Sequence, residues 1–188
     1  ELNNPVPSTP MLFIKPATAV AGIDGPIVIP KGKGACHHEL EVSVLIGETL
    51  TNATAEAARK SVAGYGLGLD LTLRDVQGRL KEKGHPWEVA KAFDGSCPLT
   101  AFVPAEQIED PLRLDFQLER NSALQQKGNT SEMVTSIFDL VAFMSTQFTL
   151  LPGDVVMTGT PAGVGPLESG DELVLTLEPS LKGFVSVV

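Results

Sequence analysis

The sequence predicts a mainly β domain with a few helices, an α+β fold, and three observations support this class. The chain has 188 residues, the size of one domain, so we expect a single domain over residues 1–188. Its 18 glycines and 14 prolines indicate many tight turns. Segments with strand periodicity outnumber helical segments, and the two kinds do not alternate as they do in a parallel α/β fold.

The predicted elements of the first half begin with short strands at residues 10–16 and 26–30, each bounded by prolines. A longer strand at 39–45 alternates with period two, so Glu39 and Glu41 share the face opposite Leu40 and Val42. A short helix is expected at 54–63, with Thr54 as its N-cap and a stop at Gly64.

The next strand, at 65–73, carries leucines on one face, while Gly66, Gly68 and Asp70 lie on the other. A polar helix follows at 74–83, before Gly84. Further strands are predicted at 112–119, 155–160, 172–178 and 184–188. Between them, a helix capped by Thr130 carries an apolar stripe from Met133 to Phe148 that we assign to the core.

Composition excludes several kinds of function. The 23 acidic and 14 basic side chains give a net charge of −9, so we expect no binding to nucleic acid or to an anionic membrane. No apolar run reaches the roughly 18–20 residues of a membrane span. Cys36 and Cys97 form no C-x-x-C pair and are too few for a disulfide scaffold, which favours a cytoplasmic location.

Three carboxylates form the first candidate site. Glu39 and Glu41 point the same way on one strand, about 6–7 Å apart, and repel each other unless a proton or cation lies between them. An isolated pair of this kind is commonly a solvated strand face. However, Asp70 stands on the glycine-lined face of the next strand, where a third ligand would be expected. Carboxylate oxygens select Mg²⁺, Mn²⁺ or Ca²⁺.

For other polar residues near these strands, the sequence allows both a functional and a purely structural interpretation. Arg74 and Gln77 lie one helical turn apart and suit an anionic ligand such as a 2-oxo acid, although each alone is typical of a surface. Lys91, among alanines and a phenylalanine, is either a buried cation aimed at a developing oxyanion or a lysine whose end reaches solvent. The stretch 158–165 could bind a carboxylate or form a tight turn.

Several enzyme classes lack their motifs. His38-Glu39 does not continue to H-E-x-x-H, because Val42 stands at the last position. Ser96 lies in no G-x-S-x-G elbow, and its neighbours do not support a nucleophile. His37 and His38 alternate across a strand, so at most one of them faces the carboxylates.

Taken together, the motifs resemble the fumarylacetoacetate hydrolase superfamily over residues 10 to about 175. The resemblance rests on an ordered set: Phe13-Ile14-Lys15-Pro16, His37-His38-Glu39-Leu40-Glu41, Gly64-Tyr65-Gly66, the stretch from Asp70 to Gln77, Pro86-Trp87 to Lys91, and Thr158-Gly159-Thr160-Pro161. The match is closest to the branch of small acylpyruvate hydrolases and oxaloacetate decarboxylases.

The resemblance implies a mixed β-roll or β-sandwich of the family's C-terminal catalytic type, a homodimer, and one divalent cation per chain. Mg²⁺ or Mn²⁺ is the usual ion. Position by position, it implies these roles: metal ligands Glu39, Glu41 and Asp70, substrate-binding Arg74, Gln77 and Thr160, and catalytic Lys91.

One family feature is incomplete. The family carries a lid whose His–Glu pair activates water, and Glu1 falls at the position of that glutamate. Glu1 is therefore a second candidate catalytic residue. Its histidine would lie three residues upstream, on a lid segment that we expect to precede residue 1.

The function implied is metal-dependent hydrolysis of a carbon–carbon bond in 2,4-dioxo acids, acylpyruvates such as fumarylpyruvate or acetylpyruvate, to give pyruvate. The same stabilised enolate would serve an oxaloacetate decarboxylase or a keto–enol tautomerase, and chain chemistry does not choose among the three. A metal-stabilised binding module without activity is a more remote alternative.

Overall fold

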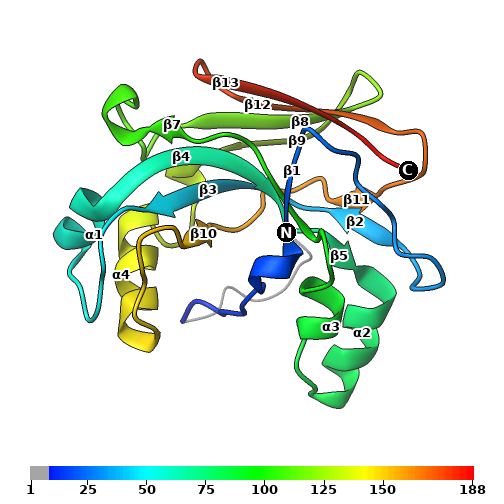
Figure 1. Cartoon of the computed structure of the whole chain (residues 1–188), viewed down its shortest axis with the longest axis horizontal. Coiled ribbons are helices and arrows are strands. Elements are labelled where there is room, and N and C mark those ends of the chain that lie inside the picture. Colours follow the sequence, from blue (N-terminus) through cyan, green and yellow to red (C-terminus); the bar gives the residue numbers. More distant parts are fainter. Residues whose placement is uncertain (1–8) are drawn as a thin grey trace.

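The computed structural model describes residues 9–188, and within them the strands form three sheets (Figure 1). The six-stranded sheet has the order β1 (Val20–Gly22), β6 (Cys97–Leu99), β4 (Val62–Leu69), β3 (Leu40–Ile46) and β10 (Val155–Met157), with β7 (Val103–Pro104) also paired to β4. The four-stranded sheet has the order β13 (Leu181–Ser186), β12 (Glu172–Leu177), β8 (Asp115–Arg120) and β9 (Ala123–Asn129). The smallest has the order β11 (Gly165–Pro166), β2 (Cys36–His38) and β5 (Thr72–Leu73).

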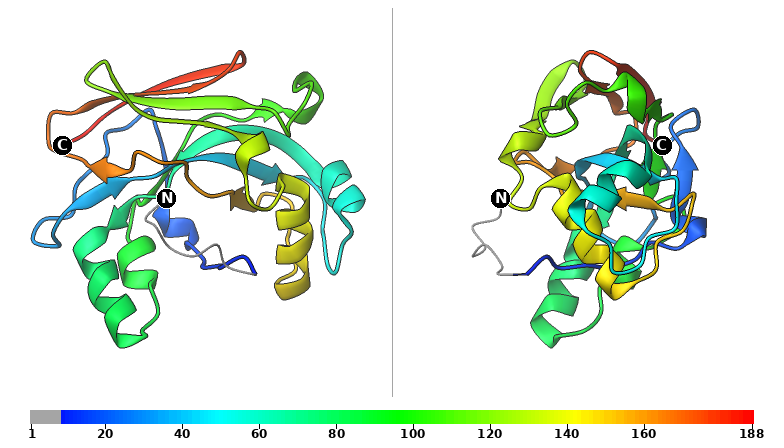
Figure 2. Two further views of the ribbon diagram at one scale, coloured as in Figure 1. Left: turned by 180° about the vertical axis from the view of Figure 1, so that it is seen from behind. Right: turned by 90° about the vertical axis from the view of Figure 1, so that its left-hand side faces the viewer.

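The four-stranded sheet lies across one face of β3 and β4, and the helices at 74–83, 88–91 and 137–147 lie on the opposite side (Figures 1 and 2). The α-helices are α1 (Ala55–Ser61), α2 (Arg74–Lys83), α3 (Glu88–Lys91) and α4 (Ile137–Gln147). The 3₁₀ helices are η1 (Ala17–Ala19), η2 (Ala105–Gln107) and η3 (Thr130–Glu132). Helices α1 and α4 pack together at one end of the sheet, and α2 and α3 lie at the other end (Figure 1). The predicted mainly β class is confirmed.

The pairing of β3 with β4 separates the core from the polar face. Leu40 pairs with Leu69 and Val42 with Leu67, and all four side chains are fully buried. Glu41 lies opposite Gly68 in the same register. Because alternate residues point to opposite faces, the apolar pairs build the core while the acidic residue and the glycine share the other face.

Local capping explains the helices that the sequence predicted. Thr54 accepts a hydrogen bond from the amide of Ala57 and begins α1, as predicted. Helix α1 ends at Ser61, before the predicted stop at Gly64, because Val62 already belongs to β4. Helix α2 has the predicted bounds, and Gly84 ends it in the left-handed conformation at φ 63°.

The prediction of two proline-bounded strands, at residues 10–16 and 26–30, is wrong. Residues 10–16 form no strand, and residues 26–30 make only an isolated bridge between Ile27 and Val187. Prolines at the ends of both segments lack the amide hydrogen that a ladder needs.

Two further predictions need correction. The strand expected at 65–73 divides at Asp70 and Leu71, because the chain leaves β3 there and continues into β5 against β2. The helix expected from Thr130 is a 3₁₀ turn, and α4 begins separately with Ser136 as its N-cap. At the end of its stripe Phe148 is 44% exposed, so this residue is not in the core.

No helix among residues 9–188 is both long and apolar enough to cross a bilayer.

Candidate active site

The three predicted carboxylates come together on the side of β3 and β4 away from the four-stranded sheet. Glu39 stands between β2 and β3, Glu41 lies in β3, and Asp70 follows β4; all three are buried. One oxygen of each lies within 4.8 Å of the others. The backbone sets this spacing, since the amide of Asp70 donates to the carbonyl of Glu39 at 2.8 Å and Gly68 places no side chain opposite Glu41.

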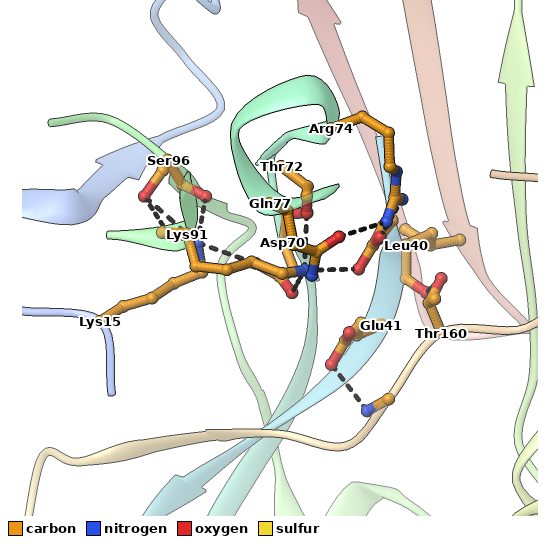
Figure 3. Close-up of polar contacts among 12 residues, drawn as sticks. Lys15, Leu40, Glu41, Asp70, Thr72, Arg74, Gln77, Lys91, Ser96 and Thr160 are labelled. Carbon is orange, nitrogen blue, oxygen red and sulfur yellow. Dashed lines mark hydrogen bonds and ion pairs between the residues drawn. The ribbon is translucent and has the colours of Figure 1, made fainter. Parts of the chain in front are cut away.

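Lys91, on α3, bridges two of these carboxylates. Its Nζ donates to Glu39 Oε2 at 2.8 Å and to Thr72 Oγ1 at 2.6 Å, and it forms a close ion pair with Asp70 (Figure 3). The side chain is only 3% exposed. Of the two readings of the sequence, the structure therefore has the buried cation and not the lysine that reaches solvent.

A second lysine reaches the cluster from a segment predicted as strand. Lys15 Nζ lies 2.8 Å from Asp70 Oδ1 and donates to the carbonyl of Ser96 at 3.0 Å and to its Oγ at 3.2 Å (Figure 3). Lys15 belongs to one of the motifs that carry the family resemblance, but no role was predicted for it from the sequence. Its signal was the motif itself, because alternation along residues 10–16 does not show which way a side chain turns.

Arg74 and Gln77 lie at the start of α2, beside the cluster, as their spacing predicted. Arg74 NH1 donates to Gln77 Oε1 at 2.7 Å, and NH2 forms a close ion pair with Glu39. Gln77 is 7% exposed. The Gln77 carbonyl and Glu39 thus hold the guanidinium, while within residues 9–188 the Gln77 amide nitrogen donates to no residue and is available to a ligand.

The loop after β10 closes the site from the other side. Gly159 has a φ of 98° and donates its amide hydrogen to Glu41 Oε2 at 2.6 Å. Thr160 donates its hydroxyl to the carbonyl of Leu40 at 2.8 Å. The stretch 158–165 contains no hydrogen-bonded turn, and its amide at Gly159, in the left-handed conformation, instead binds the carboxylate of Glu41.

The electrostatic environments of the three carboxylates differ. Burial and the neighbouring charge of Asp70 raise the pKa of Glu41 to about 8, against the amide of Gly159. Burial raises the pKa of Asp70, although Lys15 and Lys91 oppose it. Burial would also raise the pKa of Glu39, but Lys91 and Arg74 outweigh burial and hold that pKa below its usual value.

The donor set fits a hard divalent cation. Glu41 forms no ion pair with a lysine or arginine of residues 9–188, and its one donor there is a backbone amide. A buried carboxylate in that state must hold a proton or neutralise a cation. Three carboxylate oxygens within 4.8 Å are the ligands that Mg²⁺ and Mn²⁺ prefer, and Ca²⁺ takes the same ligand type.

A polar chain behind Thr160 was not predicted from the sequence. His38 Nδ1 lies 2.9 Å from Gln126 Oε1, and Gln126 Nε2 donates to Thr160 Oγ1 at 2.8 Å. No sequence signal could find Gln126, because β9 meets β2 and β3 only in three dimensions. Neither His37 nor His38 bonds to a carboxylate of the cluster among the described residues. Glu1, the second catalytic candidate, lies outside the described residues.

Comparison with known proteins places these features in one family. The family model described as fumarylacetoacetate (FAA) hydrolase C-terminal matches residues 1–186. The oxaloacetate tautomerase YcgM of Escherichia coli K12 is 54% identical over 179 residues, covering 95% of this chain and 82% of that protein. The mitochondrial oxaloacetate tautomerase FAHD1 of Bos taurus is 46% identical over 173 residues, covering 92% and 78%.

The fold agrees with a liganded relative. The crystal structure of fumarylpyruvate hydrolase from Pseudomonas aeruginosa, in complex with Mn²⁺ and pyruvate, superposes with a TM-score of 0.89 at 36% identity, covering 94% of this chain and 77% of that one. The resemblance proposed from the sequence motifs is confirmed. This chain belongs to the fumarylacetoacetate hydrolase family.

Proposed function

We propose that this chain is a divalent-metal-dependent keto–enol tautomerase of oxaloacetate or a closely related 2-oxo dicarboxylic acid. The observation that carries the proposal is the buried triad of carboxylates with Lys91 bonded to two of them, in a chain 54% identical to an oxaloacetate tautomerase. Tautomerisation was one of the alternatives left open by the sequence. The relatives favour it over the carbon–carbon hydrolysis that was the main prediction.

Glu39, Glu41 and Asp70 would hold the cation, with Mn²⁺ or Mg²⁺ as the proposed ion. When bound, the cation supplies Lewis-acid polarisation of an oxo group. Lys91 and Lys15 already neutralise Asp70, and Lys91 and Arg74 neutralise Glu39. Glu41 is the ligand left for the cation to neutralise.

Arg74, Gln77 and Thr160 are the proposed contacts of the substrate's carboxylate end. Arg74 supplies the positive charge, and its orientation is fixed by Gln77 Oε1 at 2.7 Å. Gln77 lies one helical turn further along α2, and its amide hydrogens, which no residue of the described chain accepts, are the second proposed donors to the substrate. A planar guanidinium beside an amide donor matches the planar carboxylate of a 2-oxo acid.

Lys91 is the proposed stabiliser of the reacting centre. The keto and enol forms differ in the position of one proton: the C3–H bond breaks, its electron pair forms the C2=C3 double bond, and the C=O π pair moves to the 2-oxo oxygen, where a proton binds in place of the one lost from C3. Negative charge grows on that oxygen as C3 loses its hydrogen. A buried ammonium held by Thr72 and Glu39 is fixed in advance, which makes it an effective stabiliser of that charge.

The reaction needs neither an attacking water nor a leaving group. This agrees with the sequence, which supports no serine or cysteine nucleophile. Acylpyruvate hydrolysis is the second candidate, favoured by the likeness to a fumarylpyruvate hydrolase. It would use a water activated by the lid pair that includes Glu1. Decarboxylation of oxaloacetate draws on the same enolate.

Three assays on one preparation test the assignment. Ultraviolet absorbance of the enol follows tautomerisation of oxaloacetate, while pyruvate release is followed from oxaloacetate and from acetylpyruvate. We expect the highest kcat/KM for tautomerisation, and no measurable rate after chelation of the metal. Faster pyruvate release from acetylpyruvate would instead support hydrolysis, and no activity in any assay would support the binding module.

Replacement of Lys91 separates rate from binding. Lys91→Met should lower kcat by about 10²–10³-fold with little change in KM, because the ammonium acts on charge that develops during reaction. Lys83→Met, at the exposed end of α2, is the matched control and should keep the parental kcat. Mn²⁺ affinity is measured in both. A normal kcat for Lys91→Met would remove its proposed role.

The homodimer and the cytoplasmic location remain predictions. A relative is mitochondrial by name, so the family does not fix the compartment.

A further inference from the structure

Gln126 is a buried amide whose hydrogen-bonding capacity is fully used. It lies in β9 of the four-stranded sheet and is 1% exposed. Its Oε1 accepts from the backbone amide of Leu40 at 3.0 Å and contacts His38 Nδ1 at 2.9 Å. Its Nε2 donates to Thr160 Oγ1 at 2.8 Å and to the carbonyl of Pro161 at 3.0 Å. Both lone pairs and both hydrogens therefore have partners.

These partners fix which way the amide points. A backbone amide such as that of Leu40 only donates, so the atom facing it must be the carbonyl oxygen of Gln126. His38 Nδ1 faces the same oxygen and must therefore carry a hydrogen. The other ring nitrogen of His38 has no hydrogen-bond partner within residues 9–188, so Gln126 is the one polar contact of this fully buried ring there.

The amide reaches the active-site loop from behind. Thr160 accepts from Gln126 and donates to the carbonyl of Leu40 at 2.8 Å, so its hydroxyl is held from two directions. Gln126 also binds the next residue of the loop, Pro161. The amide thus joins Leu40, which lies at the start of β3 between Glu39 and Glu41, to the loop that carries Thr160.

We propose that Gln126, oriented by His38, is a positioning residue that sets the Thr160 loop for substrate binding. This inference rests on the proposed function in one respect, namely that Thr160 contacts the substrate carboxylate, which it would do through its backbone amide because its hydroxyl hydrogen is already donated to Leu40. Neither Gln126 nor His38 contacts a carboxylate of the metal cluster, so their effect should pass through the loop and leave metal binding intact.

A double-mutant cycle tests this on the full chain loaded with Mn²⁺, with oxalate as the probe and calorimetry as the measurement. Gln126→Met keeps the length of the side chain but loses both donors. We expect it to weaken oxalate binding at least tenfold and to change Mn²⁺ affinity less than twofold. Thr160→Val should also weaken oxalate binding, and the double variant should lose clearly less than the product of the two single losses, because both changes remove the same Gln126–Thr160 hydrogen bond.

Two outcomes would overturn the proposal. One is a folded Gln126→Met variant that binds oxalate within twofold of the parent. The other is a double variant whose loss equals the product of the two single losses, since Gln126 would then act independently of Thr160.

Variants of His38 keep the proposal testable if Gln126→Met does not fold. His38→Asn places an amide donor near the position of Nδ1 and should retain oxalate affinity, whereas His38→Leu should lose it. Equal affinities in the two variants would contradict the orienting role of His38.

A metal-free readout separates this proposal from the proposed function. Hydrogen exchange of residues 158–163 in the metal-free protein should be faster in Gln126→Met than in the parent. If the Mn²⁺-loaded parent does not bind oxalate, the substrate assignment fails, and faster exchange would still support positioning of the loop. Unchanged exchange would overturn the positioning role itself.

Discussion

Glu41 shows how one residue can carry the chemistry of a site. It is buried at 5% exposure, it shares a strand face with Glu39, and its hydrogen-bond donor within residues 9–188 is the amide of Gly159. Its neighbours in the cluster have lysine or arginine partners, whereas Glu41 has none among the described residues. Burial beside Asp70 therefore makes the ionised form of Glu41 unstable without a cation.

This environment predicts how stability of the metal-free protein depends on pH. The pKa of Glu41 is raised from 4.5 to about 8, so the folded chain keeps a proton that the unfolded chain has lost. The protonated Glu41 carboxyl stabilises the folded state at low pH. This stabilisation is lost as the pH rises from about 4.5 to about 8. The free energy of unfolding should fall by about 1.4 kcal/mol per pH unit relative to Glu41→Gln.

Urea denaturation in a chelator at pH 6, 7 and 8 measures this difference. Glu82→Gln, at an exposed site on α2, is the control and should follow the parent at every pH. Parallel pH dependences of the parent and Glu41→Gln would contradict the assigned environment.

At the scale of an element, the glycines at positions 64, 66 and 68 leave one face of β4 without side chains. Gly68 lies opposite Glu41, and a Cβ added there would stand 2.7 Å from Ser43 Oγ, 2.8 Å from Leu99 and 2.9 Å from Met157. A side chain at this position, two residues before Asp70, would therefore force the ends of these three side chains to move.

Gly68→Ala should lower the free energy of unfolding by about 1–3 kcal/mol, the usual effect of overpacking a closed site. Gly78→Ala is the matched control: it lies exposed in α2, and a Cβ there meets nothing within 4 Å. Helix propensity predicts that this change stabilises the protein by about 1 kcal/mol. Urea denaturation measures both, and a Gly68→Ala variant as stable as the parent would show that the strands can move apart.

At the scale of the molecule, the apolar core and the candidate site lie on opposite faces of β3 and β4. The four-stranded sheet covers the apolar face of β3 and β4, while the carboxylates and both lysines of the site lie on the side where α2 and α3 pack (Figures 1 and 3). The site thus joins segments far apart in sequence: Lys15, Glu39, Asp70 and Lys91, and the loop at 158–161. A cation bound there should stabilise the whole fold.

Mn²⁺ at about 100 times its dissociation constant should raise the melting temperature by roughly 5–10 °C, because a ligand that binds only the folded state adds about 2.7 kcal/mol at that ratio. Glu41→Gln and Asp70→Asn should lose this shift, since two carboxylates do not supply the charge that holds the ion. Glu82→Gln should keep it. Differential scanning calorimetry with and without Mn²⁺ measures the shift, and an undiminished rise in Asp70→Asn would argue against the site.

The sequence by itself determined the elements whose pattern is local. Alternation placed the strands around Glu39–Glu41 and before Asp70, and capping signals placed α1 and α2, because both depend on residues within a few positions of one another. The same local periods put the carboxylates on one face of each strand. Ordered motifs then identified the family and its candidate residues.

Only the tertiary structure decided how distant segments meet. Residues 10–16 have a strand-like composition, but they find no ladder partner and instead bring Lys15 to Asp70. Gln126 looks like any polar strand residue until β9 packs behind β2 and β3, where it becomes the link between His38 and Thr160. The physical reason is that hydrogen bonds and charges across sheets depend on which strands are neighbours, and periodicity within a strand does not encode that choice.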